Sequence, residues 1–90
     1  MEGKRTRIDI IRDMLSSIID KGGQIKPTHL MYKSNMSHGQ MKEYLDDLVK
    51  NELVKKMKKG NYDYVIITDK GQEFIQKLRE IKEFERAFGL

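Results

Sequence analysis

The spacing of apolar residues changes twice along this chain, and the order of those changes limits the folds that it can adopt. Up to residue 49, apolar residues recur mostly every three or four positions, which is typical of amphipathic helices. Residues 53–68, LVKKMKKGNYDYVIIT, instead indicate two strands joined at KKGN. Helical spacing returns after residue 68. A helical region, a hairpin and a further helix are therefore expected within 90 residues, enough for one small core.

The helical region contains two predicted helices before residue 35. The first covers residues 6–20 and ends at Gly22 and Gly23, because glycine favours helix termination. Pro27 suits the first turn of a second helix, which we expect to end at Ser34. The apolar positions of the first helix are Ile8, Ile11, Leu15, Ile18 and Ile19.

A third helix is predicted after a short turn at Asn35 and Met36. Ser37 and Gln40 form a capping box at its start, in which each side chain accepts a hydrogen bond from a backbone N–H. We expect Asn51 to end this helix in the left-handed conformation, since asparagine tolerates a positive φ. The predicted buried stripe consists of Met41, Tyr44, Leu45, Leu48 and Val49.

The C-terminal third supplies the hairpin and the last helix. The second strand is predicted at Tyr62–Ile67. It carries apolar or aromatic groups on both faces, so its inward side is ambiguous, and we favour Val65 and Ile67. Asp69 suits the positive end of a final helix that extends to about Phe88. The order α-α-α-β-β-α predicts a mainly α fold with a small β-hairpin, the winged helix-turn-helix. We expect a flexible basic arm at residues 1–7, the winged domain at 8–68 and the C-terminal helix at 69–90.

Charge is mixed, with a modest basic excess. Lys and Arg number 18 against 14 Asp and Glu, which gives a net charge of +4. This excess permits nucleic-acid binding without demanding it. Basic residues gather in segments 21–42 and 55–59, on either side of the acidic segment 43–52. A solvated lysine-rich face would explain either basic segment alone about equally well.

Several function classes are not expected. The lack of cysteine excludes disulfides and thiolate chemistry. No Ser/His/Asp set, glycine-rich phosphate loop or metal-ligand spacing is present, and His29 and His38 form no known metal pattern, so we predict no enzyme, metal or cofactor. No apolar run of 18 residues and no signal peptide are found, which favours a cytoplasmic chain without a membrane partner. No small-molecule ligand is predicted.

Two stretches of the chain, THLMYKSNMSHGQMKEYLDDLVKNELV at residues 28–54 and YVIITDKGQEFIQKL at residues 64–78, are similar to those of a known family. They resemble small archaeal winged-helix DNA-binding proteins that dimerise through a C-terminal antiparallel coiled coil, the ten-a class. The resemblance implies sequence-tolerant or weakly specific binding of double-stranded DNA, by a transcriptional regulator or a chromatin-associated protein at the nucleoid. Members usually carry glycine at the position of Glu52, so Asn51 is expected to stop the helix here, and the final helix is short for the class.

The N-terminal end of the third helix is the predicted DNA contact, because a helix-turn-helix inserts this positive end into the major groove. Gln40 could pair with adenine, although the capping box competes for the same amide. The helix has no arginine, so we expect it to position the protein more than it reads sequence. The candidates within this recognition helix, residues 37–51, are Ser37, His38, Gly39, Gln40 and Lys42.

Further contacts are predicted outside the recognition helix. The hairpin tip at residues 58–61 would reach phosphates or the minor groove, and Lys33 would lie near the DNA backbone. Lysines on a strand edge also prevent unwanted strand pairing, which is the competing explanation for the tip. The candidates are Lys58, Lys59 and Asn61 in the tip and Lys4, Arg5 and Arg7 in the N-terminal arm.

The last helix is predicted to bind a second copy of the chain. Its apolar residues continue beyond the reach of one small core, and each phenylalanine left in water would forgo about 1.5–3 kcal/mol. The alternative is that the helix folds back on the first helix. The expected dimer interface consists of Leu78, Ile81, Phe84, Glu85 and Phe88.

These observations predict a homodimer that binds double-stranded DNA with strong salt dependence and low specificity, because phosphate contacts would supply most of its affinity. The alternative function is a winged-helix protein–protein interaction module that does not bind DNA. In that case the basic hairpin and the terminal helix would dock onto an acidic partner.

Overall fold

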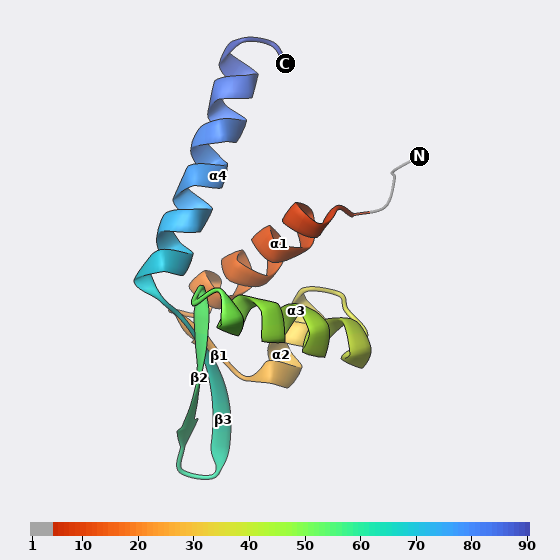
Figure 1. Cartoon of the computed structure of the whole chain (residues 1–90), viewed down its shortest axis with the longest axis vertical. Helices are drawn as coiled ribbons and strands as arrows, with labels where there is room; N and C mark the ends of the chain where they lie inside the picture. The colour runs from red at the N-terminus through yellow and green to blue at the C-terminus, as the bar shows by residue number, and fades with distance from the viewer. Residues whose placement is uncertain (1–4) are drawn as a thin grey trace.

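The computed structural model describes residues 5–90, which form four helices and three short strands (Figure 1). The predicted order of three helices, a hairpin and a final helix is confirmed, with one additional strand. The elements are α1 (Arg7–Asp20), β1 (Gln24–Ile25), α2 (Pro27–Lys33), α3 (His38–Lys50), β2 (Val54–Lys59), β3 (Tyr62–Ile67) and α4 (Asp69–Ala87).

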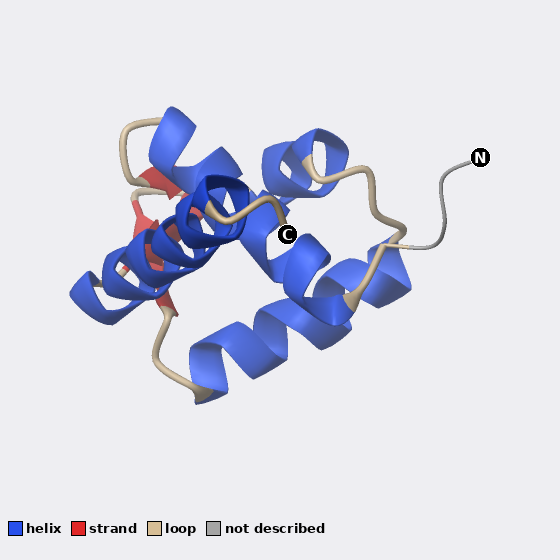
Figure 2. Ribbon diagram, turned by 90° about the horizontal axis from the view of Figure 1, so that it is seen from above, coloured by secondary structure: helices blue, strands red, loops and turns tan. Residues whose placement is uncertain are grey.

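The molecule is elongated, with principal extents of 49 × 30 × 22 Å. The strands gather on one side of the cluster formed by α1, α2 and α3 (Figure 2). The hairpin of β2 and β3, called the wing from here on, and α4 point in opposite directions along the long axis (Figure 1). Both therefore extend beyond the helical cluster.

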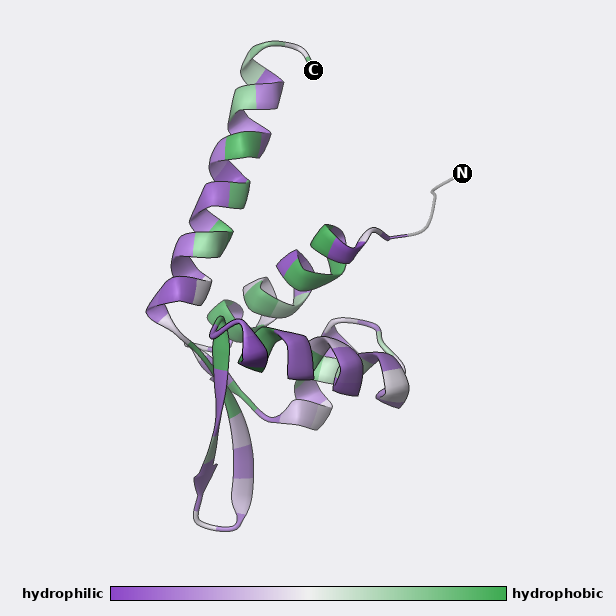
Figure 3. Ribbon diagram, viewed as in Figure 1, coloured by the Kyte–Doolittle hydropathy of each residue, from purple (hydrophilic) through white to green (hydrophobic). Residues whose placement is uncertain are grey.

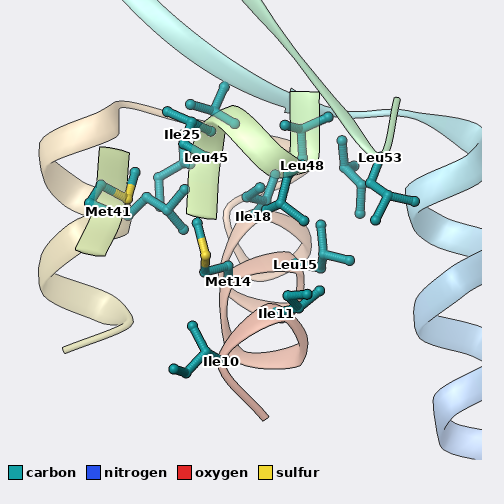
Figure 4. Close-up of a cluster of buried hydrophobic side chains, with 14 of the residues drawn as sticks. Ile10, Ile11, Met14, Leu15, Ile18, Ile25, Met41, Leu45, Leu48 and Leu53 are labelled. Carbon is teal, nitrogen blue, oxygen red and sulfur yellow. The ribbon is translucent and has the colours of Figure 1, made fainter. Parts of the chain in front are cut away.

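The core lies between α1, α3 and the inner face of the sheet. Met14, Leu15 and Ile18 of α1 are fully buried, and Leu45 and Leu48 of α3 pack into the same cluster (Figure 4). Tyr44 and Val49 are partly buried against it. The predicted apolar stripe of the third helix is therefore confirmed, and its burial fixes which side of α3 faces outward.

Side-chain caps set where α1 and α3 begin. The Thr6 hydroxyl accepts from the Asp9 backbone N–H at 3.1 Å, and the Asp9 carboxylate accepts from the Thr6 backbone N–H at 3.0 Å. Ser37 and Gln40 form the same arrangement at the start of α3, which confirms the predicted capping box. Each box satisfies backbone donors that the first helical turn leaves unpaired.

The strand β1 was not predicted. It pairs with β3 through Gln24↔Ile66 and Ile25↔Val65, which gives a three-stranded antiparallel sheet in the order β1-β3-β2. Two residues carry no measurable alternation, so no periodicity could reveal this strand. Val65 and Ile67 are buried, so the favoured inward side of β3 is confirmed.

The predicted left-handed cap at Asn51 is wrong. Asn51 has a φ of −89°, and the following Glu52 adopts the positive value of 61°. The Asn51 side chain instead donates to the Asp47 carbonyl at 2.9 Å. The left-handed residue directly precedes Leu53, whose backbone N–H reaches the Leu48 carbonyl at 2.9 Å and whose side chain is buried. A glutamate therefore occupies a position that favours glycine.

The junction between the wing and α4 is tightly packed. Thr68 caps α4, accepting from the Gly71 N–H at 3.0 Å, and its hydroxyl donates to the Glu52 carbonyl at 2.6 Å. The Thr68 N–H reaches the Leu53 carbonyl at 3.1 Å. A Cβ added at Gly71 would clash with that same carbonyl oxygen. The first turn of α4 thus rests directly on the backbone that follows α3.

Candidate nucleic-acid interface

The N-terminal end of α3 exposes a small polar surface. His38, Gly39 and Lys42 are exposed, and none of the residues from 37 to 42 is acidic. The Gln40 side-chain oxygen accepts from the Ser37 N–H at 3.3 Å, so the cap occupies the amide that a base contact would need. The outer side of α3 is hydrophilic (Figure 3). This end can therefore present its helix dipole and two side chains to an anion.

Gly39 has no structural reason to be glycine within the described chain. A Cβ built at this position would meet no atom within 4 Å, and its φ is not in the positive range. Glycine in a helix costs up to about 1 kcal/mol relative to alanine. The open surface at Gly39 would allow the backbone to approach an external partner closely.

The acidic residues on the later turns of α3 are matched by cations. Asp46 lies 3.7 Å from the Lys42 ammonium and 3.9 Å from that of Lys56, which belongs to β2. Asp47 accepts from the Arg7 guanidinium at 2.7 Å. This hydrogen bond is the main cause that raises the pKa of Arg7 above its usual value. Repulsion between these carboxylates and a polyanion is therefore reduced.

The strand register divides the wing lysines between two faces. Lys56 and Lys58 pair with Val65 and Asp63, on the face that carries the buried side chains of the sheet and that lies against α3. Lys59 pairs with Tyr62 on the opposite face, because neighbouring side chains of a strand alternate. The Lys59 ammonium donates to the Gln24 side chain at 2.7 Å.

The structure thus separates the residues that the sequence grouped at the wing tip. Lys58 lies on the α3 face, whereas Lys59 turns toward β1. The turn itself contains Gly60, with a φ of 62°, and the exposed Asn61. Lys56 was not selected from the sequence, although strand alternation places it on the same face as Lys58.

The remaining basic candidates lie on the periphery of the helical cluster. Lys33 is exposed in the last turn of α2. Arg5 donates to Asp13 at 2.9 Å and to the Asn35 carbonyl at 3.1 Å. Arg7 is the first residue of α1 and therefore belongs to the helix and not to an arm. Lys4 lies outside the described residues.

The distal half of α4 exposes an apolar surface. Ile81, Phe84 and Phe88 are 55%, 61% and 67% exposed, and the two phenylalanine rings lie 4.8 Å apart. Glu85 is half-buried beside them. Leu78 instead packs against the domain core. The alternative in which the last helix folds back on the first would require α1 to cover this surface. Within residues 5–90, α1 does not cover it.

Two kinds of feature are absent from the described part of the chain. No group of three or more His, Cys, Asp or Glu side chains there is arranged to hold a metal ion. No helix in that part has both the length and the apolar character needed to cross a membrane.

Comparison with known proteins identifies similar chains. A profile described as winged helix-turn-helix matches residues 4–86. An uncharacterized protein of Methanocaldococcus jannaschii is 32% identical over 80 residues, which cover 89% of this chain and 76% of that protein.

Solved structures share the fold. Sso10a-2, a DNA-binding protein from Sulfolobus solfataricus, has a TM-score of 0.78 at 20% identity, covering 93% of this chain and 85% of that one. F93 from STIV, a winged-helix DNA-binding protein, has a TM-score of 0.75 at 18% identity, covering 93% and 95%. A MarR family protein from Bacillus stearothermophilus has a TM-score of 0.78 at 18% identity, covering 94% and 59%.

Proposed function

Because the chain belongs to the winged helix-turn-helix family, we propose that it binds double-stranded DNA through the N-terminal end of α3. The observation that carries this proposal is the exposed, acid-free surface of Ser37, His38, Gly39 and Lys42. A helix end of this kind presents partial positive charge and lets a backbone approach the major groove. The occupied amide of Gln40 leaves little direct base reading, so binding would be weakly specific.

The wing would add contacts on the same side as α3. Lys56 and Lys58 share the face of the sheet that lies against α3, and Lys33 is exposed at the end of α2. Lysines without bidentate geometry suit phosphates better than base edges. With Lys42, these residues would neutralise about four phosphates per protomer, for a salt slope of roughly −3.6 in log K against log salt.

The protein would act as a homodimer and as a transcriptional regulator or chromatin-associated protein at the nucleoid. The exposed side chains of Ile81, Phe84 and Phe88 support a second copy of the chain as the partner of α4. Burying them against the same helix of that copy would place two α3 ends on one duplex. The DNA-binding proteins that share this fold support the same assignment.

The proposal is tested by titrating a fluorescent random-sequence duplex at 50 and 200 mM salt. We expect binding that weakens steeply with salt, and a loss of affinity of at least tenfold when Lys42→Ala and Lys58→Ala are combined. Lys77→Ala on the exposed side of α4 removes one positive charge away from the proposed surface and serves as the control.

An absence of binding at 50 mM salt would exclude the DNA function. It would leave the protein–protein interaction module, which the exposed apolar end of α4 favours. Equal affinity of the double variant and the control would show that DNA binds elsewhere on the chain.

A further inference from the structure

The outer face of the sheet, turned away from the core, carries lysines and tyrosines together. Tyr62 and Tyr64 project from this face of β3, and Lys59 pairs with Tyr62 on β2. Gln24 of β1 lies opposite Ile66 on the same face. Lys26 follows β1, and its ammonium reaches Tyr62. None of these residues contributes to the hydrophobic core.

The cations lie directly beside the two aromatic rings. The Lys26 ammonium lies 4.1 Å from the centre of the Tyr62 ring, and the Lys59 ammonium lies 5.8 Å from that of Tyr64. Tyr62 is 57% exposed. Both contacts form at the surface of the protein. Each lysine ammonium can therefore move from the ring to a phosphate, while a nucleic-acid base stacks on the ring.

A shallow hollow adjoins this face. It has a volume of about 320 Å³ and is lined by Lys21, Gln24, Ile25, Lys26, His29 and Tyr64. The lining includes two lysines and a histidine but no carboxylate. The hollow therefore attracts an anion and offers an aromatic ring at its edge.

The spacing of the rings selects the form of the nucleic acid. Residues i and i+2 of a strand lie about 7 Å apart, whereas stacked bases in a duplex are separated by about 3.4 Å. Bases that stack on both rings must therefore be unpaired and separated from each other. We propose that the outer face of the sheet is a binding site for single-stranded nucleic acid, with bases on Tyr62 and Tyr64 and phosphates on Lys26, Lys59 and the hollow.

This site is independent of the proposed duplex contact. Lys42 and Lys58 belong to the surface around α3, and Lys26 and Tyr62 belong to the opposite face of the sheet. Substitutions can therefore change one activity without the other. A failure of duplex binding would leave the single-strand site open to test.

The test uses fluorescent 15-nucleotide oligo(dT) and oligo(U), with a 15-base-pair duplex for comparison, at 50 mM salt. We expect the wild type to bind at least one single strand, and Tyr62→Ala to weaken that binding about tenfold while duplex affinity stays unchanged. Tyr62→Phe keeps the ring and should retain the affinity. Lys42→Ala should leave single-strand binding unchanged. The two oligonucleotides distinguish DNA from RNA as the preferred strand.

Tyrosine emission gives a second readout, since the chain has four tyrosines and no tryptophan. Stacking should quench this emission when unlabelled oligonucleotide is added, and the quenching should fall in Tyr62→Phe although affinity remains. The proposal is overturned if neither single strand binds the wild type. It is also overturned if Tyr62→Ala and Tyr64→Leu variants that keep the wild-type circular dichroism bind single strands as tightly as the wild type.

Discussion

Asp46 lies where one side chain can adjust the strength of the proposed DNA-binding surface. Its carboxylate lies between Lys42 of the same helix and Lys56 of the wing, at 3.7 and 3.9 Å. All three side chains are more than half exposed, so each ion pair contributes at most about 1 kcal/mol. The same carboxylate would compete with DNA phosphates for both lysines.

We therefore expect Asp46→Asn to tighten duplex binding about two- to fivefold, as measured by fluorescence anisotropy at 50 mM salt. Glu43→Gln removes the same charge from the same helix, and Glu43 forms no ion pair among residues 5–90, so its effect should be smaller. An equal gain in both variants would mean that general repulsion, and not competition for the two lysines, accounts for the effect.

The backbone is strained at Glu52 but not at the preceding Asn51. A non-glycine residue at a φ of 61° costs roughly 1 kcal/mol or more. Glu52→Gly should therefore raise the free energy of unfolding by about 1 kcal/mol in urea titrations. Asn51→Gly, at a φ of −89° and with loss of the bond to Asp47, should lower it. Stabilisation by Asn51→Gly and not by Glu52→Gly would contradict the left-handed conformation at Glu52.

Among the elements, the four helices and the wing were predictable from the sequence, and the two-residue strand β1 was not. The helices and the wing follow from apolar spacing, the capping box at Ser37 and the turn at Gly60. The two residues of β1 form a strand only because Ile66 and Val65 lie beside them. The left-handed turn shifted from Asn51 to Glu52 for a similar reason, since Leu53 must enter the core.

The candidate site was predictable where it depends on local spacing, and not where it depends on contacts between distant segments. The exposed start of α3 was identified correctly as a surface, because helical spacing defines its buried side. Strand alternation alone separates Lys58 from Lys59, but which of the two lies on the α3 face depends on the register with β3. The pairing of Asp46 with Lys56 depends on how β2 packs against α3. Such long-range contacts are not encoded in local spacing.

The start of α1 should make stability depend on pH. The hydrogen bond from the Thr6 backbone N–H is the main cause that lowers the pKa of Asp9 below its usual 3.8, with a smaller contribution from Arg12. A carboxyl group with a lowered pKa in the folded state stabilises that state above its unfolded pKa. The stabilisation is lost as the pH falls through the folded value.

We therefore expect Asp9→Asn to lower the urea midpoint at pH 7, and the difference from the wild type to shrink as the pH falls below 3.8. Asp20→Asn, an exposed change at the other end of α1, is the control. If the urea midpoints of the wild type and Asp9→Asn still differ by the same amount at pH 2.5, the ionised Asp9 carboxylate does not account for the stabilisation.

The first turn of α4 tolerates no added side chain at Gly71. Alanine there would clash with the Leu53 carbonyl oxygen, so Gly71→Ala should destabilise the fold by at least about 2 kcal/mol in thermal or urea unfolding. The same substitution at Gly39, where a Cβ meets no atom, should instead stabilise by up to about 1 kcal/mol. Similar effects at both positions would contradict the close approach of α4 to Leu53.

At the scale of the whole molecule, the exposed end of α4 predicts self-association. Replacing Ile81 and Phe84 by aspartate should place four charges in the proposed interface of a dimer and abolish it, because unpaired charges cannot be buried there. Sedimentation velocity should then show a change from dimer to monomer mass, while the circular dichroism of the domain is kept. Arg79→Ala, at an exposed position of the same helix, should remain dimeric. An unchanged mass in the double variant would exclude this interface.

The tight junction of Thr68, Gly71 and Leu53 also determines how a dimer could be re-engineered. Since α4 leaves the domain without a flexible linker, its length and direction would set the separation of the two α3 helices. Inserting or deleting seven residues in α4, about two helical turns, would move each domain by about 10.5 Å along the helix axis and rotate it by only about 20°. In the proposed dimer, such a change would alter the distance along the duplex between the two α3 contacts, although no residue of the proposed DNA surface had been changed.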